Sequence, residues 1–108
     1  MAKYLVLYRA SLSAPEQMAS GTPEQAQAGM KLWMQWAGKA GSAIVDMGSP
    51  LRSVATLGKA GLPLIGGFSV LEADDSDALK DLLDDHPHFR TPGDSGIEVL
   101  EFLSIPGM

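Results

Sequence analysis

The chain interleaves strand patterns with two helix patterns, and this alternation limits its fold more than any other feature. Strand-like runs are predicted at 3–10, 42–47, 66–73 and 97–105, with a weak strand at 51–57. Helices are predicted at 23–40 and after the acidic pair Asp74 and Asp75. The resulting order, β-α-β-(β)-β-α-β, predicts an α+β ferredoxin-like sandwich with both helices on one face of a single sheet.

The first helix has clear boundary signals. Thr22 is a good N-cap, Pro23 suits the first helical position and Gln25 completes a capping box. Gly41 is predicted to end this helix as a left-handed cap. Before it, residues 11–22 form a small-residue loop, which is either a lid or the site of a short helical turn. Pro87 is predicted to stop the second helix.

Size and charge exclude several classes of protein. With 108 residues the chain is predicted to form one domain, residues 1–108. The net charge is −5 and the eight Lys and Arg residues are scattered, which argues against a nucleic-acid partner. The apolar runs are far shorter than a membrane span, so no membrane partner is expected.

The absence of cysteine bears on both chemistry and compartment. It rules out disulfides, thiolate metal sites and cysteine nucleophiles. The first residues also lack a small-residue cleavage site of the kind that ends a signal peptide. A cytoplasmic location is the default expectation, although a cysteine-free chain also fits other compartments.

The first strand predicts an oligomer. Residues 3–10, KYLVLYRA, carry apolar side chains on both alternating faces, so both faces need cover. Two helices on one face leave the other face bare. A second copy packed sheet to sheet would cover it, which predicts a homodimer with a barrel-like core.

Several short motifs together resemble the YCII-related family, which includes the DGPF-type domains. They are IVDMGSPL, GGFSVLEADD, LLDDHPHF and IEVLEFLSIPGM, with KYLVLYR and the TPEQ helix start before them. The resemblance covers nearly the whole chain. It implies a dimeric α+β barrel and a polar cleft suited to small-molecule acid–base chemistry.

The chain departs from this family at one point that matters for catalysis. Some relatives carry a histidine–aspartate pair with the histidine on the first helix, but residues 23–40 contain no histidine. The Asp-Gly-Pro-Phe tetrapeptide is also missing, and the nearest stretch is LIGGF at 64–68. The family's catalytic pair therefore cannot be transferred to this sequence.

The two histidines, His86 and His88, flank Pro87. His86 continues an apolar helix face formed by leucines and is predicted to act as a general acid or base, since imidazole titrates near neutral pH. The alternative is that a helix C-terminus simply favours a cationic side chain. Two closely spaced histidines without a third ligand do not predict a zinc site.

Asp46 lies late in a short strand, next to a Gly-Ser-Pro turn. Its predicted catalytic role is to orient His86 or to abstract a proton. The alternative is that its carboxylate accepts hydrogen bonds from the N–H groups of the turn.

Arg9, Arg52 and Tyr8 are the predicted substrate-binding residues. Either arginine can hold a substrate carboxylate by two parallel hydrogen bonds. The alternative is a cross-strand ion pair with Glu72, Glu98 or Glu101.

Two functions from different classes follow. The first is a lyase- or isomerase-type enzyme in which His86 and Asp46 move a proton on an anionic small-molecule substrate, without a metal or organic cofactor. The second is a non-catalytic dimer that binds a ligand or a partner protein. The serines support no hydrolase, because none lies in a Gly-x-Ser-x-Gly context.

Overall fold

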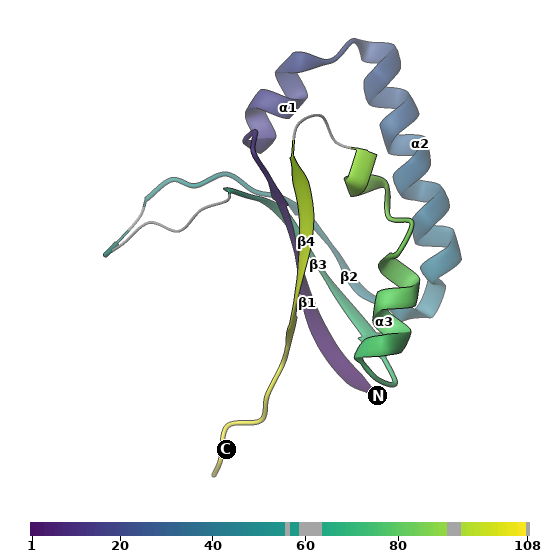
Figure 1. The fold of residues 1–108 in the computed structure, drawn as a ribbon, viewed down its shortest axis with the longest axis vertical. Coiled ribbons are helices and arrows are strands. Elements are labelled where there is room, and N and C mark those ends of the chain that lie inside the picture. Colours follow the sequence, from purple (N-terminus) through teal and green to yellow (C-terminus); the bar gives the residue numbers. More distant parts are fainter. Residues whose placement is uncertain (56, 59–63, 91–93, 108) are drawn as a thin grey trace.

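The computed structural model describes residues 1–55, 57–58, 64–90 and 94–107. Within these residues the fold has four strands, three α-helices and two short 3-10 helices (Figure 1). In chain order they are β1 (Ala2–Ala10), α1 (Ala14–Ser20), α2 (Pro23–Ala40), η1 (Gly41–Ala43), β2 (Ile44–Pro50), β3 (Leu64–Ala73), α3 (Ser76–Leu83), η2 (Pro87–Arg90) and β4 (Ser95–Glu101).

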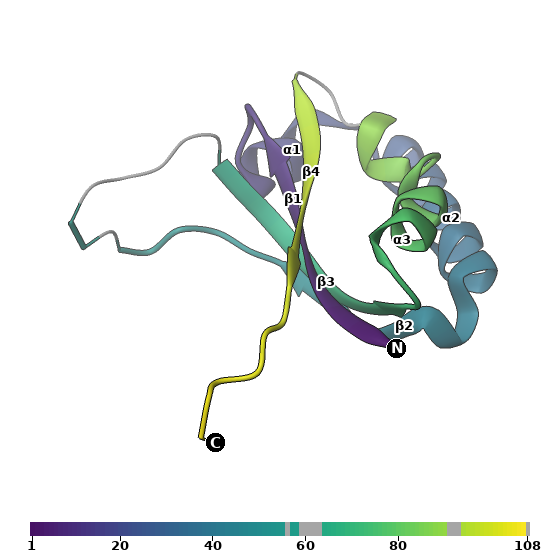
Figure 2. The ribbon, with the colours of Figure 1, turned by 60° about the horizontal axis from the view of Figure 1, so that its bottom comes forward.

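The strands form one antiparallel sheet in the order β2-β3-β1-β4. The two central strands, β1 and β3, are far apart in the chain and pair along almost their whole length. Helices α2 and α3 lie on the same side of the sheet in both views (Figures 1 and 2). This is the predicted ferredoxin-like α+β arrangement, and the sheet order confirms it.

The core lies between this sheet and the helices. Tyr4, Val6 and Tyr8 alternate along β1 toward the helices, as the two-residue period of a strand requires. They meet Trp36 from α2 and Leu79 from α3. The indole Nε1 of Trp36 donates a hydrogen bond to the carbonyl of Leu82 at 3.0 Å, which ties the two helical segments together.

Local signals position the helices. The capping box predicted at Thr22 is present, because Thr22 Oγ1 accepts from the Gln25 amide and Gln25 Oε1 accepts from the Thr22 amide. A second capping box, between Ser13 and Glu16, starts α1. Residues 11–22 therefore contain a short helix, which was one of the two predicted alternatives.

Three details of the predicted fold need correction. Residues 51–55 form no strand, and residue 56 of the weak strand predicted at 51–57 lies outside the described part. Gly41 does have a positive φ, 54°, but its ψ of −124° lies outside the left-handed helical region. The last strand ends at Glu101 rather than at residue 105, although the amide of Phe102 still bonds the carbonyl of Lys3.

The face of the sheet opposite the helices is bare. None of the described helices lies on it in either view, and both residues 51–55 and the C-terminal tail extend on that side (Figure 2). Apolar side chains of this face remain exposed, including Val45 at 47%, Leu100 at 42% and Phe102 at 52%. We call these three residues, with Leu5 and Leu7, the outer apolar face.

Candidate functional site

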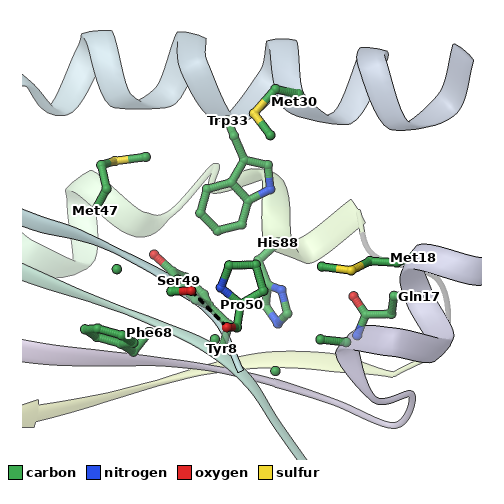
Figure 3. A pocket seen from close by; sticks show the side chains of 14 residues that line it. Tyr8, Gln17, Met18, Met30, Trp33, Met47, Ser49, Pro50, Phe68 and His88 are labelled. Atoms are coloured by element: carbon green, nitrogen blue, oxygen red, sulfur yellow. Dashed lines mark hydrogen bonds between the residues drawn. The ribbon is translucent and has the colours of Figure 1, made fainter. Parts of the chain in front are cut away.

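A cavity of about 380 Å³ lies where α1, α2 and η2 meet the β2–β3 edge of the sheet. Figure 3 shows Trp33 and Met30 reaching toward it from α2, with Met18 and Gln17 from α1. Most of the residues that line it are apolar or aromatic. The full lining consists of Tyr8, Ala14, Gln17, Met18, Met30, Trp33, Met47, Gly48, Ser49, Pro50, Gly66, Gly67, Phe68 and His88. No Asp, Glu, Lys or Arg is among them, so the described residues give the wall no fixed charge.

Tyr8 supplies the cavity with a buried hydroxyl group. Its Oη donates to Ser69 Oγ at 2.8 Å, and Ser69 Oγ donates in turn to the carbonyl of Met47 at 2.7 Å. Burial raises the pKa of the Tyr8 phenol, and the bond to Ser69 offsets part of that rise. Tyr8 is therefore a neutral phenol at physiological pH.

Close backbone approach between β2 and β3 shapes one wall of the cavity. Gly48 has a φ of 80°, and a Cβ atom there would lie 1.6 Å from the carbonyl oxygen of Phe68. Register shifts on both sides of Asp46 accompany this approach. Only glycine fits position 48, because any side chain would meet backbone that cannot move aside.

His88 lies in η2 and also lines the cavity. Its side chain is buried, and Nε2 lies 2.8 Å from the carbonyl oxygen of Arg9. A carbonyl can only accept, so Nε2 carries a proton. His88 therefore joins Tyr8 as a titratable group on the cavity wall.

His86 lies behind this wall rather than on it. Its ring packs against Trp36, Trp33 and Tyr8, with centroid distances of 4.3, 4.5 and 4.9 Å. The side chain is 1% exposed, and among the described residues Nε2 has no hydrogen-bond partner. Burial, with the neighbouring His88, lowers the pKa of His86 to about 4, so the ring is neutral at pH 7.

Asp46 and His86 are not joined by a hydrogen bond in the described structure. The Asp46 carboxylate accepts from the amide of Gly48 at 2.8 Å, which is the turn-capping role given above as the alternative. It borders a separate, shallow hollow of about 480 Å³ on the outer face, beside Lys3 and Phe102. The catalytic roles of His86 and Asp46 remain predictions.

The three predicted substrate-binding residues are not gathered in one place. Tyr8 lines the cavity, but Arg9 is the next residue of β1 and points to the opposite face. There Arg9 Nε donates to Glu98 Oε1 at 2.6 Å, which is the cross-strand pairing considered as the alternative. Arg52 is exposed in the irregular segment after β2 and does not line the cavity.

Sequence reasoning assigned no role to Ser69 or to His88. A signal for Ser69 does exist, since it is a polar residue at an inward position of β3, two residues before buried Leu71. No comparable signal placed Met18, Met30 and Met47 around one cavity. They come from three separate elements, and only the tertiary fold brings them together.

The described part of the chain offers neither a metal cluster nor a membrane helix. Within the described ranges, no three His, Asp or Glu side chains lie close enough to hold a metal ion. Of the helices that the structure describes, none is long and apolar enough to cross a bilayer.

No protein-family model matches the sequence. No curated protein matches it either. Among solved structures, one that matches is 5-chloro-2-hydroxyhydroquinone dehydrochlorinase from Burkholderia phenoliruptrix, in complex with 2,5-dihydroxybenzoquinone. The two proteins share 15% sequence identity over 88% of this chain and 90% of that chain, with a TM-score of 0.49. A similarity at this level does not indicate a shared ligand. The assignment of the fold rests on the strand order of the sheet.

Proposed function

We propose that this protein binds a small, neutral, largely apolar molecule, most suitably an aromatic one, in the cavity bounded by Tyr8 and Trp33. The composition of the wall is the observation that carries this proposal. It combines two aromatic rings in edge-to-face contact, with centroids 5.1 Å apart, and the thioethers of Met18, Met30 and Met47. Aromatic faces and methionine sulfur favour a flat, polarisable ligand.

The missing charge changes the expected ligand class. An anionic substrate would need a cationic group to offset its desolvation, and the described lining contains no arginine or lysine. Arg9 is already paired with Glu98 on the other face. A neutral molecule with one or two polar groups therefore suits the cavity better than a carboxylate.

The two tryptophans allow a direct test of this proposal. Trp33 lines the cavity, whereas Trp36 is buried behind it. A panel of neutral one- and two-ring aromatic compounds is expected to raise the melting temperature and to change the tryptophan fluorescence. Trp33→Phe should abolish the fluorescence response while Trp36→Phe keeps it. If no compound at millimolar concentration changes either signal, the proposal is wrong.

The second candidate function is an acid–base enzyme acting on such a ligand. What favours it is that Tyr8 and His88, two groups able to move protons, both line the cavity. A ligand C–H bond next to a carbonyl or on an electron-rich ring should then exchange with solvent deuterium. Proton NMR in D2O would detect this exchange, and His88→Gln should abolish it. Exchange at the same rate in that variant would exclude His88 as the base.

The homodimer is proposed on the outer apolar face. Two sheets packed through it would bury Val45, Leu100 and Phe102, which are otherwise exposed. Such a dimer would have the two-sheet core that the resemblance to YCII-related proteins implies. Membership of the YCII-related family, with its DGPF-type domains, is likewise proposed. A cytoplasmic location is also proposed.

A further inference from the structure

We infer that Ser69 sets the hydrogen-bond polarity of the cavity, so that Tyr8 offers its ligand an acceptor rather than a donor. The inference rests on the proposed binding function and deepens it. It assigns a specificity-determining role to a serine that does not itself line the cavity.

The direction of the hydrogen-bond chain fixes this polarity. The chain ends on the carbonyl oxygen of Met47, which can only accept. Ser69 has a single hydroxyl proton and uses it on that carbonyl. The 2.8 Å bond between Tyr8 and Ser69 can therefore form only if Tyr8 donates.

Burial makes the arrangement costly to reverse. Ser69 is 0% exposed and does not line the cavity, so water cannot replace Tyr8 as the donor to its hydroxyl oxygen. If Tyr8 turned its proton toward a ligand, the contact with Ser69 would bring together two oxygens with no proton between them. The free-energy cost of leaving these two buried oxygens without a hydrogen bond exceeds the free energy gained from one neutral hydrogen bond to a ligand.

The ligand class follows from this direction. With its proton committed to Ser69, Tyr8 Oη has lone pairs available for a ligand hydroxyl or N–H group. The cavity should thus prefer an aromatic ring bearing a hydrogen-bond donor over the same ring bearing only an acceptor. A site built around one polarity discriminates because the mismatched ligand leaves a buried group unsatisfied.

Indole and benzofuran test this preference directly. They share one bicyclic shape, but indole carries an N–H donor and benzofuran carries a ring oxygen that only accepts. Dissociation constants from ligand-observed NMR on the intact wild-type chain should favour indole by about fivefold. Ser69→Ala releases the Tyr8 proton and should bring that ratio to one or below.

Control variants separate polarity from a general loss of structure. Ser53→Ala removes an exposed serine outside the cavity and should keep the wild-type ratio. Tyr8→Phe removes the acceptor itself and should also bring the ratio to one, which provides a second route if Ser69→Ala does not fold.

Each result decides something. Equal affinities in the wild type, or an unchanged ratio in Ser69→Ala or Tyr8→Phe, would overturn the polarity inference alone. If neither compound binds the wild-type chain, the proposed binding function fails, and the inference that rests on it fails too.

Discussion

The backbone amide of His88 donates a hydrogen bond to Nδ1 of His86 at 3.0 Å. Because Nδ1 accepts, the proton of the neutral His86 ring lies on Nε2. Protonation of Nδ1 would break this bond and place a charge among Trp33, Trp36 and Tyr8. The neutral His86 ring thus supports two residues of the cavity wall, Tyr8 and Trp33, and the core residue Trp36 behind them.

This arrangement predicts acid-sensitive stability. The pKa of His86 falls from 6.5 to about 4 on folding, so between these values the unfolded chain holds more protons than the folded one. Stability is then complete above about pH 6.5 and is lost as the pH falls toward 4, by up to about 3 kcal/mol. Urea unfolding at pH 7 and pH 4.5 would measure the difference.

The variant His86→Phe keeps a ring in the same place but cannot titrate. Its unfolding free energy should change much less between pH 7 and pH 4.5 than that of the wild type. Asp85 and Glu16 have lowered pKa values, so their contributions are lost only at more acidic pH. An equal pH dependence in the two proteins would show that His86 is not the group responsible.

Gly48 provides a prediction about backbone geometry. Gly48→Ala forces a Cβ atom against the Phe68 carbonyl and strains a positive φ, so it should cost at least about 3 kcal/mol. Gly58→Ala is the matched control, since Gly58 also has a positive φ, 75°, but no non-neighbouring atom of the described residues lies within 4 Å of its added Cβ. The control should lose only roughly 1–2 kcal/mol by chemical denaturation. Equal losses would mean that the close approach of β2 and β3 is not rigid.

Trp36 is expected to matter for stability. Trp36→Phe removes the hydrogen bond to the Leu82 carbonyl and leaves a void in the core, for a loss of about 2 kcal/mol. Thermal unfolding followed by circular dichroism would measure it. Trp33→Phe, at a more exposed position, should cost less. A larger loss for Trp33→Phe than for Trp36→Phe would contradict the placement of Trp36 in the core and of Trp33 at its edge.

The proposed dimer makes a prediction about mass in solution. The wild-type chain should sediment as a dimer at micromolar concentration, and Leu100→Glu should convert it to a monomer by placing a charge on the outer apolar face. Met34→Glu is a suitable control because Met34 is 53% exposed on α2, on the helical side. A wild-type monomer, or a variant Leu100→Glu that stays dimeric, would contradict this interface.

The sequence predicts which residue types can act in this site, but not which side chains meet there, because those contacts join residues that are far apart in the chain. His86 and Asp46 have side chains suited to acid–base chemistry, but residue type does not say which face of an element a side chain takes. Tyr8 and Arg9 are neighbours in the chain, yet the strand turns one to the cavity and the other to Glu98. Consecutive residues of a strand point to opposite faces, so Tyr8 and Arg9 do not line the same cavity.

The sequence by itself determined the strands that form the sheet, though not the absence of a strand at 51–55, together with the capped helix after Thr22 and the order that yields a ferredoxin-like sheet. These depend on short-range effects, namely two-residue alternation and capping within three residues. Only the tertiary structure decided which side chains share the cavity. Tyr8, Ser69 and the Met47 carbonyl lie on three strands, and their contact depends on register and on the close approach at Gly48, which no local pattern encodes.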